Sequence, residues 1–395
     1  MRPREITSGV YWVGAVDWDR RLFDALIPLP DGTSYNAYLI KGSEKIALID
    51  TVDPTMELSL FDNLDRLGVK KIDYVVVNHA EQDHSGALPK VLEVYPQARV
   101  VTTPKCREML ASLLLIPEDR IVTVADGETL SLGDKTLEFI YAPWVHWPET
   151  MLTYLREDKA LFPCDLFGSH LATSELYVTD EGRVYEAAKR YYAEIMMPFR
   201  THIQKHLERL KNYELKVVAA SHGPLYDKPE FILSAYRRWA SNEPENIVVL
   251  PYISMHGSTR KMVEYLVGAL TENGVSVQQF DLSVTDLGKL AMSLVDAATL
   301  VLGVPTALVG AHPPVAYAAL LANVLRPKLK FVSIIGSYGW GSKAIEQLSG
   351  MIPNLKAEVL EPVYVKGSPR AEDFRALNRL AETIAGKHRE SGLIP

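Results

Sequence analysis

The chain has 395 residues, of which 47% are apolar, so it is long enough for two domains with separate hydrophobic cores. Its formal net charge is −7 and its acids and bases are interspersed, which leaves no basic surface for the phosphate backbone of nucleic acid. No stretch reaches the roughly 18 apolar residues that cross a membrane, and the first residues lack the apolar core of a signal peptide, so we expect a cytoplasmic protein that binds no membrane.

The first half of the chain is predicted to mix short strands with helices, in an α/β or α+β arrangement. Six segments have the pattern of strands that end in turn-forming or polar residues, namely 35–40, 45–50, 73–78, 98–103, 135–142 and 160–165. Near residue 245 a polar, proline-containing stretch gives way to a strand of buried type. We therefore expect a domain boundary there, with a first domain over 1–245 and a second over 246–395.

The segment after the third of these strands concentrates potential metal ligands. It reads NHAEQDHSGALP over residues 78–89. Side chains of an extended segment alternate between two faces, so His79, Glu81 and Asp83 are expected to project to one side and converge. The residues from His84 onward look like the start of a helix, which puts the cluster in a loop beyond the carboxyl end of a strand, where open α/β sheets bind ligands. A solvated polar loop with an incidental histidine is the alternative.

Three more strands in the first half are each followed by one ligand-type residue. Alone, each has a simpler explanation, as a helix-capping carboxylate or a histidine satisfied in the core. Together with the first cluster they supply three imidazoles and three carboxylates, enough for two metal ions with one bridging carboxylate. Asp165 is the most plausible bridge, because it follows a buried-type strand without local donors. The six candidate metal ligands are His79, Glu81, Asp83, His146, Asp165 and His222.

The two cysteines and the other histidines of the chain are expected to be structural. The chain has only Cys106 and Cys164, which excludes a disulfide framework and a Cys-x-x-Cys metal module. Cys164 adjoins Asp165, and strand alternation is expected to turn it to the opposite face, where a buried thiol packs as a small hydrophobe. Four histidines show no convergent partners and are expected on the surface or on helices: His170, His202, His206 and His388.

The second half alternates strands and helices regularly. Strands are predicted at 246–251, 275–281, 297–302, 330–336 and 357–361, with helices from 258, about 314, 342 and 370 and a helical stretch before residue 297. Five such strand–helix units form a doubly wound parallel sheet.

A hydroxyl- and glycine-rich loop joins the first of these strands to its helix. Backbone N–H groups and hydroxyls at a helix N-terminus bind a phosphate, although a serine- and threonine-rich helix cap looks much the same. No Gly-Lys-Ser/Thr sequence occurs, so nucleotide hydrolysis is not expected. The candidate phosphate loop comprises Ser254, Met255, His256, Gly257, Ser258 and Thr259.

The order of the candidate ligands resembles that of a known family. The motif His-x-Glu-x-Asp-His, followed by His, Asp and His, is similar to the metallo-β-lactamase fold in the variant found in flavodiiron proteins, or A-type flavoproteins. The resemblance extends over essentially the whole chain. It implies a metallo-β-lactamase-like αββα domain followed by a flavodoxin-like domain, with two non-haem irons in the first and FMN in the second.

Two details of the metal motif bear on its chemistry. Zinc hydrolases of this fold have histidine where this chain has Glu81, and a carboxylate favours iron by hardening the site and adding negative charge. In flavodiiron proteins the histidine that matches His84 lies close to the irons, usually without coordinating them. The resemblance therefore implies that His84 orients a carboxylate or passes a proton. A tyrosine region near the diiron pocket of relatives resembles Tyr191 and Tyr192, although helix packing explains this pair equally well. His84 and Tyr192 are thus the candidate catalytic residues.

The resemblance to flavodoxins extends to the loops after the third and fourth strands, which hold the flavin ring in that family. The first of these loops departs from the common form, because many relatives have two asparagines where this chain has Leu308 and Val309, so ring-edge hydrogen bonds there would come from backbone. The second is close to the flavodiiron pattern and offers aromatic faces and backbone donors. The candidate flavin-ring residues are Pro305, Thr306, Ala307, Ser337, Tyr338, Gly339, Trp340 and Gly341.

The family implies an oxidoreductase that reduces dioxygen to water, nitric oxide to nitrous oxide, or both, with electrons delivered through FMN. No rubredoxin-like cysteine pairs occur, so a separate donor is expected, either a rubredoxin-like protein or a reduced deazaflavin- or NADH-linked reductase. Relatives pack as head-to-tail homodimers or dimers of dimers.

Two alternatives remain: a zinc hydrolase with an appended flavodoxin domain, and an FMN electron carrier with a vestigial metal site.

Overall fold

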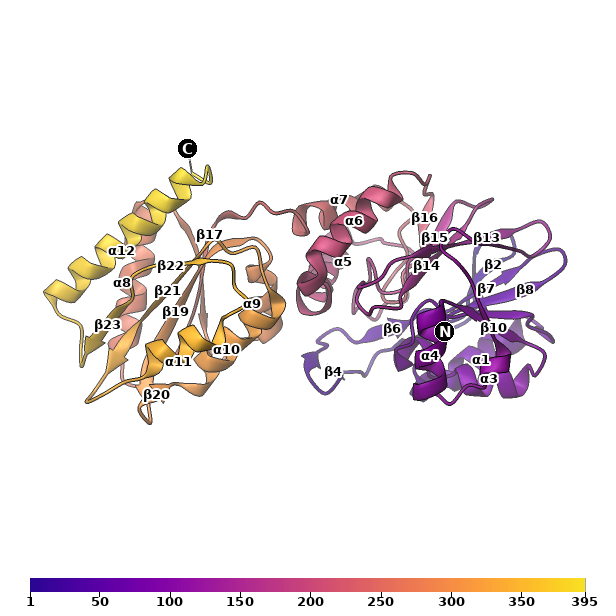
Figure 1. Ribbon diagram of the computed structural model, residues 1–395, viewed down its shortest axis with the longest axis horizontal. Helices are drawn as coiled ribbons and strands as arrows, with labels where there is room; N and C mark the ends of the chain where they lie inside the picture. The colour runs from indigo at the N-terminus through magenta and orange to yellow at the C-terminus, as the bar shows by residue number, and fades with distance from the viewer. Residues whose placement is uncertain (395) are drawn as a thin grey trace. The chain divides into compact units, whose positions relative to one another are not determined.

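The computed structural model describes residues 1–394 and divides them into two compact units (Figure 1). The first unit is Met1–Ala240 and the second begins at Ser241. Strand β17 (Glu245–Tyr252) begins at Glu245, so the expected boundary between 245 and 246 falls at the start of that strand. Among the described residues, no helix combines the length and the apolar composition needed to cross a membrane.

The first unit contains two main sheets. One is mixed, seven-stranded, and ordered β1 (Arg4–Thr7), β2 (Val10–Trp12), β7 (Tyr38–Lys41), β8 (Ile46–Ile49), β9 (Tyr74–Val76), β10 (Arg99–Thr102) and β11 (Ile121–Thr123). The other is five-stranded and ordered β12 (Thr129–Ser131), β13 (Thr136–Tyr141), β14 (Met151–Leu155), β15 (Ala160–Phe162) and β16 (Val217–Val218). Two short ribbons pair β3 (Ala15–Asp17) with β6 (Thr33–Tyr35) and β4 (Leu22–Phe23) with β5 (Ile27–Pro28).

Each of the six segments predicted as strands overlaps a strand of this unit. The helices are α1 (Glu57–Arg66), α2 (Gln82–Ser85), α3 (Leu88–Val94), α4 (Pro104–Leu113), α5 (Glu181–Tyr191), α6 (Arg200–Leu210) and α7 (Pro229–Trp239). Three 3₁₀ turns, Pro54–Met56, Glu118–Arg120 and Met197–Phe199, and a π-helical turn, Tyr192–Met196, complete the unit.

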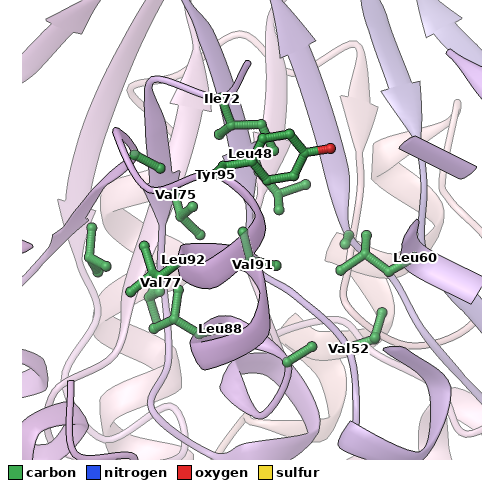
Figure 2. Packing of buried hydrophobic residues seen from close by; sticks show 14 of the residues in the cluster. Leu48, Val52, Leu60, Ile72, Val75, Val77, Leu88, Val91, Leu92 and Tyr95 are labelled. Atoms are coloured by element: carbon green, nitrogen blue, oxygen red, sulfur yellow. The ribbon is translucent and has the colours of Figure 1, made fainter. Parts of the chain in front are cut away.

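The first sheet has apolar side chains on both faces. Leu48 of β8 belongs to a core with helices α1, α3 and α4, whereas its neighbours Ala47 and Ile49 belong to a second core with Phe139 and Phe162 of the other sheet. This is the two-face alternation of a strand buried on both sides. Figure 2 shows the first of these cores, where β8 and β9 pack against α1 and α3.

The second unit is a doubly wound sheet, as predicted. Its strands lie in the order β18, β17, β19, β21 and β22, all pairs being parallel, with β20 and β23 attached to β19 and β21. The strands besides β17 are β18 (Ser276–Asp281), β19 (Ala297–Ala307), β20 (Gly310–Ala311), β21 (Phe331–Tyr338), β22 (Glu358–Val359) and β23 (Val363–Lys366). The helices are α8 (Ser258–Glu272), α9 (Leu287–Leu294), α10 (Pro313–Leu325), α11 (Ala344–Met351) and α12 (Ala371–Glu390).

Helices α8 and α12 share one apolar core with the sheet, in which Leu266 of α8 and Leu380 of α12 are buried, and Figure 1 shows them together on one face with α9 and α10 on the other. Two details differ from the prediction. The fifth strand is interrupted, so β22 and β23 pair with β21 in succession. Strand β19 runs on to Ala307 and folds back through β20.

Candidate functional site

The loop after β9 is held in place by its neighbours. Asp50 accepts hydrogen bonds from the backbone N–H of Asn78 at 2.7 Å and from its side-chain amide at 2.9 Å. Thr51 donates its hydroxyl to the carbonyl oxygen of His84 at 2.6 Å. Between these two anchors the chain passes from an extended residue, Glu81, into the helical turn α2. The expectation that residues 79–83 are extended and face one point is therefore wrong, because Asp83 lies in a helix.

The turn divides the candidate ligands into two groups. In the first group, each residue offers one ligand atom within 4.8 Å of the others: His79, Glu81, His146 and Asp165. The imidazole Nε2 atoms of His79 and His146 lie 3.1 and 3.0 Å from Oε2 of Glu81. The second group brings together Asp83, His84 and His222 within the same limit.

The nitrogen and oxygen atoms of the second group lie about as close to one another as those of the first group. Nε2 of His222 lies 3.2 Å from Oδ2 of Asp83, and Nε2 of His84 lies 3.3 Å from Oδ1 of the same carboxylate. Sequence reasoning set His84 apart from the other candidates, yet its ring nitrogen points into this group.

Asp165 faces both groups. Its Oδ2 lies 3.5 Å from Nε2 of His79 and 3.4 Å from Nε2 of His146, both in the first group. Its Oδ1 lies 3.0 Å from Nε2 of His84 and 3.3 Å from Nε2 of His222, both in the second. One carboxylate thus offers one oxygen to each group, which is the arrangement of a bridging ligand.

The charges in the cluster are closely coupled. Burial lowers the pKa of His146 and of His222, but contacts with the carboxylates of both groups outweigh it and raise these pKa values to about 9 and about 10. Burial acts to raise the pKa of Asp165, and the surrounding imidazoles hold it well below its usual range. Protons on imidazoles therefore balance the buried carboxylates, and a cation bound between them would take over that role.

The hydrogen bonding in the cluster fits a metal site. In the part of the chain that the structure describes, both carboxylate oxygens of Asp83, Nε2 of His84 and Oδ2 of Asp165 make no hydrogen bond, although each is buried. Buried polar atoms normally have partners. Imidazole nitrogens and carboxylate oxygens that converge at about 3 Å, with several of these atoms left without a hydrogen bond, are a donor set suited to divalent or trivalent iron.

Two further residues contact the cluster: Glu149, which was not predicted, and Tyr191, which was predicted only as one member of the pair Tyr191 and Tyr192. Glu149 accepts a hydrogen bond from Nδ1 of His79 at 2.7 Å. Its only sequence signal is its place shortly after His146. Tyr191 donates its hydroxyl to Oδ1 of Asp165 at 2.7 Å. Of the tyrosine pair, Tyr191 and not Tyr192 therefore reaches the cluster, because the ring of Tyr192 packs on Tyr236 and Trp239.

Two structural expectations need correction, those for Cys164 and His170. Cys164 does not turn away from Asp165: its sulfur and ligand atoms of His84 and Asp165 lie within 4.8 Å of one another, because the chain has left β15 and Cys164 has a φ of 51°. It is buried, and burial raises the pKa of its thiol well above the usual value, so it is a neutral thiol. His170 is buried, with its ring 4.8 Å from that of His222. His388 lies on α12 as a helix residue but is fully buried.

The second unit has a pocket of about 270 Å³ where the candidate phosphate loop meets the end of β19 and the end of β21 with the loop that follows it. Its lining comprises Ser254, Met255, His256, Ser258, Thr259, Pro305, Thr306, Ser337, Tyr338, Gly339, Trp340 and Gly367. Gly367 was not predicted. Of the predicted residues, Gly257, Ala307 and Gly341 are not part of the lining. Gly257 instead supplies the left-handed N-cap of α8, with a φ of 88°.

The turn between β19 and β20 carries the departure from the common family form. Leu308 and Val309 have φ values of 50° and 71°, in the left-handed region that a β-branched residue rarely adopts. Leu308 is 100% exposed. The carbonyl oxygen of Val309 accepts a hydrogen bond from the N–H of Lys343 at 2.7 Å.

Comparisons with known proteins match both units. Residues 33–223 match the ODP family beta lactamase model, and residues 250–378 match the flavodoxin model. A nitric oxide reductase from Moorella thermoacetica is 38% identical over 98% of this chain and 99% of its own length. A rubredoxin-oxygen oxidoreductase from Megalodesulfovibrio gigas is 31% identical over 98% of each chain.

Solved structures agree over the whole length. The chain is similar to rubredoxin oxygen:oxidoreductase from Desulfovibrio gigas with a TM-score of 0.94 and 30% identity, over 100% of both chains. It is similar to the flavodiiron protein from Giardia intestinalis with a TM-score of 0.90 and 28% identity, over 99% of this chain and 98% of that one.

Proposed function

The chain belongs to the flavodiiron protein family, and on that premise we propose that it reduces dioxygen to water, nitric oxide to nitrous oxide, or both, with FMN in its second unit and two irons in its first. The observation that carries the proposal is the place of Asp165, whose two carboxylate oxygens face separate groups of imidazoles and carboxylates. A single metal ion would not use both sets of atoms.

In this proposal His79, Glu81 and His146 hold one iron, and Asp83 and His222 hold the other, with Asp165 between them. The close approach of His84 to Asp83 and Asp165 favours coordination at the second position over the noncoordinating role that the resemblance implied. The negative charge of Glu81 supports iron over zinc at the first position.

The bound groups would supply the redox chemistry: FMN accepts two electrons and releases them singly, and an iron pair binds and reduces a diatomic gas. The chain's own residues hold these groups and manage protons. Burial, followed by the charge of Asp165, raises the pKa of Tyr191 well above its usual value, so its phenol stays protonated and keeps its hydrogen bond to Asp165. Tyr191 thus holds a proton beside the site, where it would be available to the oxygen atom that leaves as water.

The pocket of the second unit suits FMN. Its phosphate would lie at the N-terminus of the 15-residue helix α8, where backbone N–H groups and the hydroxyls of Ser254, Ser258 and Thr259 favour an anion. Tyr338 and Trp340 line the pocket and offer aromatic faces to a flat heterocycle.

Electron supply and assembly follow as further parts of the proposal. We propose a separate donor, a rubredoxin-like protein or a reduced deazaflavin- or NADH-linked reductase, since relatives are named for rubredoxin and for coenzyme F420H2.

We also propose a head-to-tail homodimer, alone or paired into a dimer of dimers, in which the flavin of one chain serves the irons of the other. Each unit exposes large apolar side chains that a partner could cover, Trp18, Leu26 and Trp144 in the first and Met255, Leu308 and Trp340 in the second.

Gas consumption tests the proposal against its rivals. Protein purified from medium with iron and zinc should contain about two irons and one FMN per chain, and after anaerobic reduction it should consume dioxygen or nitric oxide catalytically. Two zincs and an esterase or lactamase activity would support the hydrolase instead. Reduced protein that passes electrons to an acceptor but turns over neither gas would support the electron carrier.

A further inference from the structure

The carboxylate of Glu149 lies behind His79, on the side of the ring away from the metal cluster. Its side chain is fully buried, and Oε1 lies 2.7 Å from Nδ1 of His79. The same oxygen accepts the N–H of Ala80 at 3.0 Å. Thr103 donates its hydroxyl to the backbone carbonyl of Glu149 at 3.0 Å, which holds the residue from behind. Glu149 is therefore fixed by three contacts and has no part in either metal group.

This contact determines which ring nitrogen of His79 carries the proton and which one faces the first group. An ionised carboxylate can only accept hydrogen bonds, so Nδ1 of His79 carries the proton and Nε2 keeps its lone pair for a metal. The negative charge of Glu149 also makes the imidazole a stronger donor, as a carboxylate behind a ligating histidine generally does.

The second group has no such support. Nδ1 of His222 lies 2.6 Å from the backbone carbonyl oxygen of Ser34, a neutral acceptor that fixes the ring without adding charge. Nδ1 of His84 makes no hydrogen bond within residues 1–394. One metal position thus has a histidine whose Nδ1 donates to a buried carboxylate, whereas in the other Nδ1 of His222 donates to a neutral carbonyl and Nδ1 of His84 has no acceptor among the described residues.

We propose that Glu149 is a positioning residue that makes the two metal positions unequal. The position of His79, Glu81 and His146 takes up its metal first and holds it more tightly than the position of Asp83, His84 and His222. This inference rests on the proposed diiron site and adds an order of loading to it.

Metal titration of the full chain tests the inference without reference to activity. Protein stripped of metal but loaded with FMN would be titrated anaerobically with ferrous iron against a competing chelator. The native chain should bind two ions in two resolved steps. Glu149→Gln keeps an oxygen for Nδ1 of His79 but removes the charge, and it should weaken the tighter step by roughly 10- to 100-fold while the weaker step stays unchanged. Glu149→Ala loses both effects and should weaken the tighter step further.

Asp73→Asn is the matched control. Asp73 is a carboxylate at the other end of β9, where it accepts the N–H of Ile46 at 3.0 Å and pairs with Lys71, and it belongs to neither metal group. This variant should keep two resolved steps. Equal weakening of both steps in Glu149→Gln, or merging of the two steps in Asp73→Asn, would overturn the inference.

The native protein gives a second measurement, which does not depend on a variant that folds. Crystals of metal-free protein given one equivalent of ferrous iron should show anomalous scattering between His79, Glu81 and His146. Scattering mainly between Asp83, His84 and His222 would overturn the order of loading. A native chain that binds fewer than two ions would contradict the proposed function itself, whereas two ions of equal affinity would contradict this inference alone.

Discussion

The hydroxyl of Tyr191 donates a hydrogen bond of 2.7 Å to Oδ1 of Asp165, the oxygen that also faces His84 and His222. A protonated phenol thus contacts the carboxylate that joins the two metal groups. The adjacent Tyr192 packs on Tyr236 and Trp239 instead. The two tyrosines are neighbours in sequence with different surroundings, which makes them a matched pair for mutagenesis.

Tyr191→Phe should keep two irons and lower gas turnover on the order of 100-fold, because it removes a proton beside the site without removing a ligand. Steady-state consumption of nitric oxide and dioxygen by reduced protein measures this, with iron content as the check on assembly. Tyr192→Phe is the control and should retain most of the activity. A larger loss of turnover in Tyr192→Phe than in Tyr191→Phe would show that the proton does not come from Tyr191.

Glu81→His should retain the fold, favour zinc over iron and lose gas reduction, because an imidazole replaces the carboxylate that hardens the first position. Metal analysis of protein grown with both metals measures the shift. Glu214→His changes an exposed glutamate of the same unit and should leave metal content unchanged. Full iron content and turnover in Glu81→His would show that this residue does not select the metal.

The convergence of the candidate ligands could be predicted because each one follows a strand, and strand ends of a sheet gather at one edge. His146, Asp165 and His222 were found in this way although they are far apart in sequence. The division into two groups could not be predicted, because it depends on the helical turn that places Asp83 and His84 apart from His79. Glu149 was missed, and Tyr191 could not be distinguished from Tyr192, since their contacts arise from packing of the loop before β14 and of α5, for which there is no local sequence pattern.

We expect the stability of the second unit to depend on pH through His388. Nδ1 lies 2.8 Å from Oδ1 of Asn246 and Nε2 lies 2.7 Å from the hydroxyl of Thr299. Burial, with a smaller effect of Lys330, lowers the pKa of His388 to about 4. Between pH 6.5 and 4 the unfolded chain therefore binds a proton that the folded chain does not, so stability should fall as pH falls through this range.

Thermal release of FMN fluorescence at pH values from 7 to 4 measures this effect in the full chain. His388→Gln cannot titrate and should be less stable than the native chain at pH 7 but should lose less stability on acidification. Equal slopes for the two proteins would show that His388 is not the titrating group.

The proposed head-to-tail dimer predicts complementation between two defective chains. One chain carries Asp165→Ala and lacks irons; the other carries Gly257→Asp and Thr259→Glu and lacks FMN. Each homodimer should be inactive. The isolated heterodimer should recover about one active site, because the flavin of the first chain would serve the irons of the second. An inactive heterodimer that is assembled and contains both cofactors would contradict electron transfer across the dimer.

The central claim is that the two groups facing Asp165 form one diiron centre that reduces gas. Mössbauer spectroscopy and anaerobic stopped-flow kinetics on the same preparations, native and Asp165→Ala, test it most directly. The native chain should show two coupled irons, and its reduced flavin should be reoxidised within turnover by dioxygen or nitric oxide. Asp165→Ala should lose the coupled signal and the reoxidation while FMN stays bound. A coupled pair and normal turnover in Asp165→Ala would contradict the account.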